Sequence, residues 1–229
     1  MIRRLFFPGL LDTGPVSDRL LAIRDGFVNC YIWKTVSGLV CVDAGRSPKR
    51  TARGFAALGL NLRDVTAVFL THLHWDHAGG ARLFPNAKVY VGDREASSVF
   101  AARSLPRLIR VRDEETVLAG GLAVRVVDTP GHTSGSVSYL LDDRFLFVGD
   151  TLRLRRGEAL PMLRWFNRDG QVLDRGEHLR LLLGRIAGDR FSDDRLHIER
   201  DPALGVSVDT IGERLIGEGL ELSVSVLAT

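Results

Sequence analysis

The chain has 229 residues, of which 45% are hydrophobic and 26% charged, so it can bury a substantial core, and we expect a single domain over residues 1–229. This composition excludes a disordered chain, a collagen and a coiled coil. The net charge of +3 permits a nucleic-acid or anionic partner without predicting either, because most arginines are scattered among acidic residues.

The sequence also indicates in which cellular compartment the protein should be found. No apolar run reaches the roughly 18 to 20 uninterrupted residues that cross a bilayer, so we expect a soluble protein with no membrane partner. The basic start Met1–Arg4 is followed by an apolar stretch that Pro8 and Gly9 interrupt, unlike a signal peptide, which predicts a cytoplasmic protein. In that compartment Cys30 and Cys41 should be reduced, buried thiols rather than a disulfide.

The first predicted elements are a β-hairpin and a helix. Residues 28–33 and 39–43 alternate or are β-branched on either side of a turn at Ser37–Gly38, a pattern typical of two paired strands. Ser47–Pro48 then supplies a helix cap and a first-turn proline. Apolar residues at helical spacing extend the predicted helix to Gly59.

A buried strand should follow. Residues 65–70 form a short, nearly all-apolar run, which is typical of a strand covered on both faces. Beyond its C-terminal end we predict a helix that begins near Gly79, a strand over 88–91 and a helix over 94–103.

The second half repeats this plan, with a strand over 122–128 and a hairpin formed by 135–141 and 144–150. Both predicted hairpins end on a carboxylate, Asp43 in the first and Asp150 in the second. The repetition predicts two β-lobes that face each other, each covered outside by helices, which is a four-layer α/β sandwich. The remaining predicted elements are an amphipathic helix over 175–186 and a short strand over 196–198.

Histidines are concentrated in one stretch, the run 71–80. His72, His74 and His77 lie there beside Asp76. A strand would present only the first two on one face and a helix would separate all four, so we expect a loop wrapped around a common centre. Imidazole and carboxylate groups are the ligands that zinc prefers, and they also suit iron and manganese, so the run predicts a metal site.

These four residues spell H-x-H-x-D-H, which resembles the signature of the metallo-β-lactamase superfamily. The stretches around His132 and Asp150 are similar to the second histidine motif and the bridging-aspartate motif of that family, and the likeness extends over about residues 25–152. It implies a four-layer αββα sandwich with metal ions between the lobes. It implies one ion held by His72, His74 and His132, a second held by Asp76 and His77, and Asp150 between them.

Two further features near this set bear on how the ligands are held. Asp43 either orients a metal ligand or is a simple turn carboxylate. Thr133, Ser134 and Ser136 are interpreted as hydroxyls that shape the loop around His132, because the resemblance requires no serine nucleophile.

The resemblance is weakest after residue 152. Members of the family usually supply one more histidine ligand late in the chain, and two residues compete for that position. Either Arg200 has replaced it with a cation that cannot bind metal, or a shifted loop lets His197 serve. The first alternative makes a single firmly held ion plausible, either zinc or ferrous iron. His178 is expected on the surface of a helix.

The resemblance implies a hydrolase of a small ester, thioester, lactone or amide. A bound zinc ion, or a pair of ions, lowers the pKa of water from about 15.7 to roughly 7, so the nucleophile would be a metal-bound hydroxide. Asp76 is assigned to orient this hydroxide and to pass a proton to the leaving group.

The substrate should be a small molecule, and it would be anionic if the segment 153–168 lies over the cleft, where Arg164 and Arg168 could bind a carboxylate or phosphate. That segment is otherwise a solvated connection. The alternative functions are a mononuclear iron enzyme similar to persulfide dioxygenases, a phosphodiesterase, and a non-catalytic binding protein. A nucleic-acid partner is not expected, and a homo-oligomer is compatible with the sequence.

Overall fold

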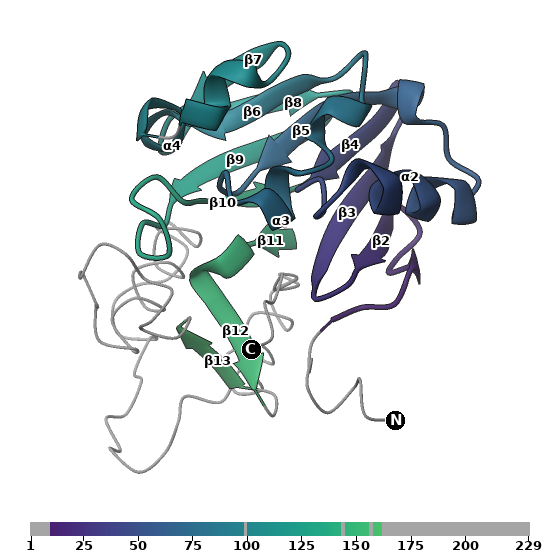
Figure 1. Ribbon diagram of the computed structural model, residues 1–229, viewed down its shortest axis with the longest axis horizontal. Helices are drawn as coiled ribbons and strands as arrows, with labels where there is room; N and C mark the ends of the chain where they lie inside the picture. The colour runs from purple at the N-terminus through teal and green to yellow at the C-terminus, as the bar shows by residue number, and fades with distance from the viewer. Residues whose placement is uncertain (1–9, 99, 143–144, 156–157, 162–229) are drawn as a thin grey trace.

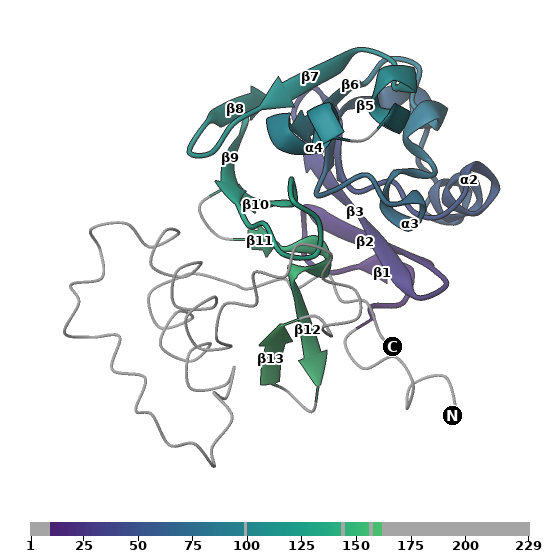
Figure 2. The same cartoon turned by 60° about the vertical axis from the view of Figure 1, so that its left-hand side comes forward.

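The computed structural model describes residues 10–98, 100–142, 145–155 and 158–161. Two β-sheets face each other at its centre (Figures 1 and 2). The first sheet has seven strands in chain order, antiparallel from β1 to β4 and parallel from β4 to β7. Its strands are β1 Gly14–Pro15, β2 Leu20–Asp25, β3 Val28–Thr35, β4 Gly38–Val42, β5 Val65–Leu70, β6 Lys88–Gly92 and β7 Leu108–Val111.

The second sheet is antiparallel, with four strands in the order β11-β10-β9-β8. These strands are β8 Thr116–Ala119, β9 Leu122–Asp128, β10 Val137–Leu141 and β11 Phe145–Phe147. A separate antiparallel pair follows, formed by β12 Leu152–Arg155 and β13 Glu158–Pro161.

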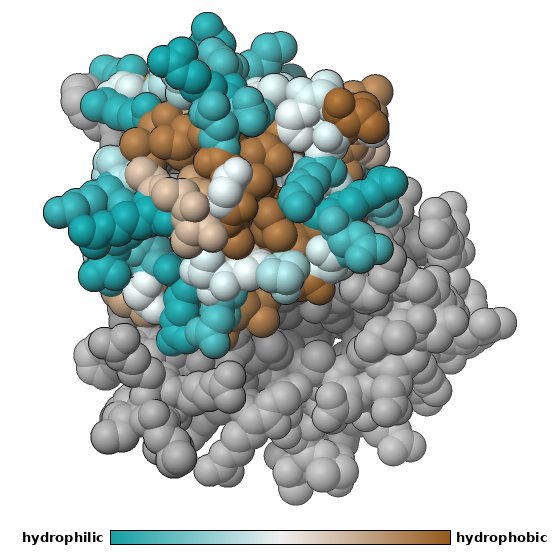
Figure 3. Space-filling view, turned by 90° about the vertical axis from the view of Figure 1, so that its right-hand side faces the viewer, coloured by the Kyte–Doolittle hydropathy of each residue, from teal (hydrophilic) through white to brown (hydrophobic). Residues whose placement is uncertain are grey.

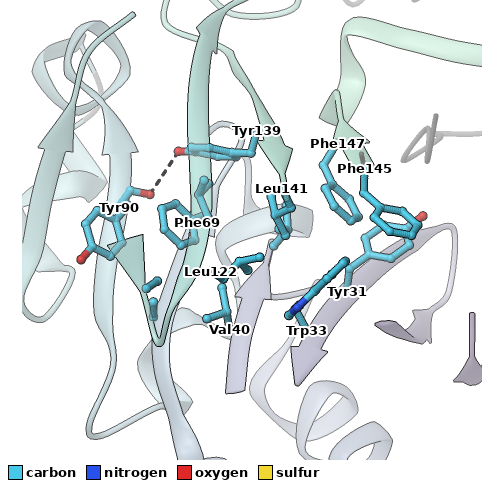
Figure 4. Packing of buried hydrophobic residues seen from close by; sticks show 14 of the residues in the cluster. Tyr31, Trp33, Val40, Phe69, Tyr90, Leu122, Tyr139, Leu141, Phe145 and Phe147 are labelled. Carbon is cyan, nitrogen blue, oxygen red and sulfur yellow. Dashed lines mark hydrogen bonds between the residues drawn. The ribbon is translucent and has the colours of Figure 1, made fainter. Parts of the chain in front are cut away.

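Aromatic side chains fill the space between the sheets (Figure 4). The ring of Phe69 in β5 stacks on Tyr90 at 4.5 Å and meets the edge of Tyr139 in β10 at 5.2 Å. The Tyr139 hydroxyl donates to the carbonyl of Leu70 at 3.0 Å, so this buried polar group is satisfied. Because β5 and β10 belong to different sheets, these contacts fix the two sheets against each other.

Helices cover the other face of the first sheet, where Phe55 of α2 and Ala96 of α4 pack among apolar side chains of the strands. Figure 2 shows the second sheet on one side of the first and α2 and α3 on the other. Some apolar side chains of this outer cluster are only partly buried, and Figure 3 shows hydrophobic side chains gathered at the surface, ringed by hydrophilic ones. The helices are α2 Pro48–Ala57, α3 Trp75–Ala78 and α4 Asp93–Ser98, with 3-10 turns η1 Leu62–Asp64, η2 Ala81–Leu83, η3 Phe100–Ser104 and η4 Gly149–Thr151.

The fold class is confirmed: the chain is an α/β sandwich in which two sheets pack face to face and the described helices cover the outer face of the first sheet. The predicted strand over 65–70 matches β5, which alternates between the two cores. The predicted cap is also confirmed, since Ser47 Oγ accepts from the Arg50 amide at 3.3 Å. The elements predicted over 175–186 and 196–198, and the full extent of a single domain, lie outside the described residues.

Two helix predictions were wrong in position. The helix expected to begin near Gly79 is α3, which instead ends at Ala78. Gly79 and Gly80 follow it and approach the carbonyls of Arg46 and Ala44 too closely for any side chain. The helix expected over 94–103 is split into α4 and η3.

Cys30 and Cys41 are buried free thiols, as predicted. Among the described helices, none has the length and apolar character needed to span a membrane.

Packing of α2 on β2 depends on the missing side chain at Gly54. A Cβ there would overlap Ile23 of β2, with Ile23 Cδ1 at 2.9 Å and Cγ2 closer still. We expect Gly54→Ala to lower the free energy of unfolding by about 1–3 kcal/mol, because Ile23 is buried and cannot move aside cheaply. Urea unfolding measures this, with exposed Arg53→Ala as the control. A Gly54→Ala protein as stable as the parent would contradict the packing.

Candidate metal centre

Three separate segments of the chain supply the predicted ligands at one end of the sandwich. His72 and His74 follow β5, His132 lies between β9 and β10, and Asp150 lies in η4. Asp76 and His77 belong to α3 rather than to the loop that the sequence predicts. The structure brings all six together as two groups that share Asp150, and the donor atoms within each group lie within 4.8 Å of one another.

The first group consists of three imidazoles around one carboxylate. His132 Nε2 lies 2.8 Å from His74 Nδ1 and 3.2 Å from Asp150 Oδ2. His72 Nε2 lies 3.9 Å from the same oxygen. The rings of His72, His74 and His132 meet edge to face, with centroids 4.6 to 4.8 Å apart. The rings therefore do not stack, and their nitrogen atoms converge on one point.

The second group contains Asp76, His77 and Asp150. His77 Nε2 lies 3.1 Å from Asp150 Oδ1, and its other nitrogen, Nδ1, lies 2.7 Å from Asp43 Oδ2. Asp150 therefore faces the first group with one oxygen and the second group with the other.

The polar atoms of this centre fit a cation. His72 Nε2, His77 Nε2 and both carboxylate oxygens of Asp150 are buried and have no hydrogen-bond partner among the residues that the structure describes. Buried polar atoms without partners are rare in native proteins because burial removes their water. Nitrogen and oxygen donors arranged in this way match the ligand set of zinc.

The pKa shifts within the cluster also favour the binding of a cation. Burial, together with the neighbouring histidines, holds the pKa of His72 well below its usual value, which favours the neutral imidazole that binds metals. Burial also raises the pKa of Asp76. Burial alone would lower the pKa of His77, but Asp150 and Asp43 outweigh it and raise that pKa well above the usual value. The paired carboxylates therefore attract positive charge to this position.

Asp43 holds two of the predicted ligands in place. Its carboxylate is fully buried and accepts from the Thr71 amide at 2.9 Å, in addition to its contact with His77. The Thr71 hydroxyl lies 3.1 Å from Asp43 and 3.1 Å from His72 Nδ1, so the same carboxylate also orients His72 through Thr71. The geometry favours the positioning role of Asp43 over a simple turn carboxylate.

Glu95 is a residue that the sequence analysis missed. Its side chain is buried in α4 and accepts from the Leu73 amide and from the Thr133 hydroxyl, each at 2.8 Å. Leu73 lies between His72 and His74, and Thr133 follows His132, so Glu95 ties the two histidine loops together. Its sequence context, a glutamate in a short helix, is the same as that of a surface residue.

The hydroxyls beside His132 differ in their contacts. Thr133 and Ser136 shape the loop as predicted, since Ser136 Oγ accepts from the Thr133 amide at 3.1 Å. Ser134 is exposed and makes no side-chain hydrogen bond within the described ranges, so its predicted role is not supported. The other candidates, Arg164, Arg168, His178, His197 and Arg200, lie outside the described residues.

Known proteins resemble this chain both in sequence and in fold. The family model described as Metallo-beta-lactamase superfamily matches residues 23–187. A metallo-beta-lactamase family protein from Thermus thermophilus superposes with a TM-score of 0.58 at 22% identity, covering 76% of this chain and 72% of that one. The subclass B3 metallo-beta-lactamase BJP-1 of Bradyrhizobium japonicum gives a TM-score of 0.53 at 22% identity, covering 62% and 64%.

Curated relatives match over part of their length. The probable polyketide biosynthesis zinc-dependent hydrolase BaeB of Bacillus velezensis is 41% identical over 39% of this chain and 40% of its own. A hydroxyacylglutathione hydrolase of Erwinia tasmaniensis is 36% identical, covering 63% and 58%. The atrochrysone carboxyl ACP thioesterase of Aspergillus fumigatus is 30% identical, covering 63% and 49%. The chain thus spans about half the length of these relatives.

The role of Asp43 can be tested without disturbing its backbone. Asp43 has a φ of 57°, a left-handed conformation that asparagine also tolerates. We expect Asp43→Asn to weaken zinc binding about 10- to 100-fold, because the amide cannot replace the charge beside His77. Chelator competition measures this affinity, with exposed Asp64→Asn as the control. Equal affinities for Asp43→Asn and the parent would refute the positioning role.

The role of Glu95 predicts two linked effects. Glu95→Ala leaves the buried Leu73 amide without its acceptor, which should lower the free energy of unfolding by about 1–3 kcal/mol. It should also weaken zinc binding, because the two histidine loops are no longer tied. Urea unfolding and zinc titration measure the two effects, with exposed Glu115→Ala as the control. Lower stability with unchanged zinc affinity would show that Glu95 does not position the ligands.

Proposed function

The chain belongs to the metallo-beta-lactamase superfamily, and on this basis we propose that it is a metal-dependent hydrolase of small esters, thioesters, lactones or amides. The observation that carries the proposal is the convergence of His72, His74, His132 and Asp150 beside the group formed by Asp76, His77 and Asp150. A metal-dependent hydrolase needs residues that bind the ion, a residue that transfers a proton, and residues that hold these side chains in position.

We propose that these two groups are the ligands of the ion or ions. A zinc ion held there would supply Lewis acidity and lower the pKa of the attacking water to roughly 7. Zinc is our first choice because the BaeB relative is named a zinc-dependent hydrolase. The sharing of Asp150 by two donor groups favours two metal positions, and iron or manganese would suit the same donors.

Asp76 is the proposed proton carrier. Its carboxylate lies in the second group, and burial raises its pKa, so it accepts a proton more readily than an ordinary aspartate. In this role it orients the attacking water, takes its proton and returns that proton to the leaving group.

The remaining residues of the centre keep these groups in place. His72 stays neutral through burial, and Asp43 and Glu95 hold the loops that carry the ligands.

Thioesters are the substrate class that we expect first. One matched relative is named a thioesterase, and another is named a hydrolase of hydroxyacylglutathione. We therefore propose a small-molecule acyl substrate.

The test combines activity with metal analysis. We expect Asp76→Asn to lower kcat for thioester hydrolysis about 10²- to 10⁴-fold, because the amide cannot accept a proton. The ion of the first group should remain, whereas His132→Ala should lose it. Thiol release and elemental analysis measure the two outcomes, with Asp64→Asn as the control. Stoichiometric iron with oxygen uptake, or full activity after removal of all metal, would contradict the proposal.

A further inference from the structure

Arg46 holds its guanidinium against two aromatic rings. Its Cζ lies 4.2 Å from the ring centroid of Phe27 and 4.9 Å from that of Trp75. The two rings meet edge to face at 6.1 Å. Phe27 lies in the turn between β2 and β3, and Trp75 is the first residue of α3. Two aromatic faces therefore hold one cation, an arrangement stabilised by cation–π attraction.

The backbone of Arg46 is also held firmly. The buried carboxylate of Asp25 accepts from the Arg46 amide at 2.7 Å and from the Ser47 amide at 3.3 Å. On the other side, Gly79 packs directly on the carbonyl of Arg46. Arg46 is thus preorganised, so its side chain would lose little conformational freedom when a ligand binds.

This arginine lies beside the metal centre. Trp75 stands in the chain between His74 and Asp76, and the Ala44 amide donates to the carbonyl of His77 at 2.7 Å. Helix α3 also contacts β3 (Figure 1). The guanidinium therefore lies against the helix that carries part of the second donor group.

Among the described residues, no neighbour neutralises the charge of Arg46. Within the described ranges no carboxylate forms an ion pair with it, and its Nε is buried without a hydrogen-bond partner. Of the Asp25 carboxylate, Oδ2 accepts the two backbone amides, and Oδ1 has no hydrogen-bond partner among the described residues and lies 3.7 Å from Arg50 Nε. Arg24, from the same strand end, is paired with Asp12 at 2.8 Å. Because buried donors normally have an acceptor, an anion is the expected partner of Arg46.

The two rings are nearly perpendicular, at 85°, so the guanidinium can lie flat on only one of them, and among the described residues none accepts a hydrogen bond from its N–H groups. A planar fork of N–H donors matches a carboxylate in a bidentate way. A single unpaired arginine suits a monoanion better than a phosphate monoester, which carries nearly two charges. Trp75 is 59% exposed, so solvent and ligands reach this cluster.

We propose that Arg46, held by Phe27 and Trp75, binds a carboxylate on the substrate, remote from the bond that is cleaved. This inference rests on the proposed hydrolase function and adds its specificity: the enzyme favours acyl substrates that carry a carboxylate. Arg46 is a specificity-determining residue in this scheme, and it takes no part in proton transfer.

Two matched pairs of thioesters test the proposal. The S-phenyl thioesters of pentanoic and glutaric acid differ by a carboxylate in place of a methyl group on the acyl chain. The butyryl thioesters of thiophenol and 4-mercaptobenzoate differ by a carboxylate on the leaving thiol. In at least one pair the anionic member should have the higher kcat/KM, and Arg46→Met should reduce that preference about tenfold or more, through KM. Unchanged preferences in both pairs would overturn the proposal.

Control variants separate this effect from a general loss of charge or folding. Arg53→Met removes one positive charge from the exposed face of α2 and should leave the preference unchanged. Arg46→Lys keeps the charge but loses the planar fork, so it should retain part of the preference, and it replaces Arg46→Met if that variant fails to fold. Equal losses for Arg53→Met and Arg46→Met would count against a specific contact.

A binding measurement keeps the test independent of catalysis. Glutarate is titrated into the zinc-loaded protein by calorimetry, and we expect Kd to rise about tenfold in Arg46→Met. If no thioester is hydrolysed but this difference is found, the proposed reaction fails and the carboxylate site stands. If hydrolysis is found but glutarate binds the parent and Arg46→Met equally, the carboxylate site fails alone.

Discussion

The candidate metal centre depends on buried carboxylates that hold its histidines from behind. Asp43 fixes His77 directly and His72 through Thr71, and Glu95 joins the loop of His74 to the loop of His132. A carboxylate can remain charged inside a protein only if donors surround it, and here the donors belong to the loops that need positioning. The cost of burying these charges is thus offset by interactions that also set the geometry of the site.

The sandwich supplies the rigid frame on which these loops converge. Phe69 and Tyr139 lock the two sheets together just behind the ends of β5 and β10, and the Tyr139 hydroxyl binds the last carbonyl of β5. His72 lies two residues after Leu70, which carries that carbonyl. Only a very short length of chain therefore separates the packed core from these donor atoms, which restricts the motion of the donor atoms.

Much of this organisation could be predicted from the sequence, because the signals were local. Alternation and β-branching identified β3 and β4, and the all-apolar run identified β5. The spacing of the histidines indicated which side chains to bring together, although not that Trp75–Ala78 within the run are helical. Tertiary contacts decided the rest: position 79 must be a glycine because the backbone of Arg46 is close, and Glu95 and Arg46 acquire their surroundings only in the folded chain.

The turn that carries Asp150 limits how such a site can be altered. Gly149 has a φ of 53°, and a Cβ there would collide with Thr71, the residue that links Asp43 to His72. Any larger residue would strain its own backbone and displace Thr71, which contacts both Asp43 and His72. Directed evolution toward new substrates would consequently find almost no tolerated change at this glycine, whereas the exposed indole of Trp75 offers a position where diversity can accumulate.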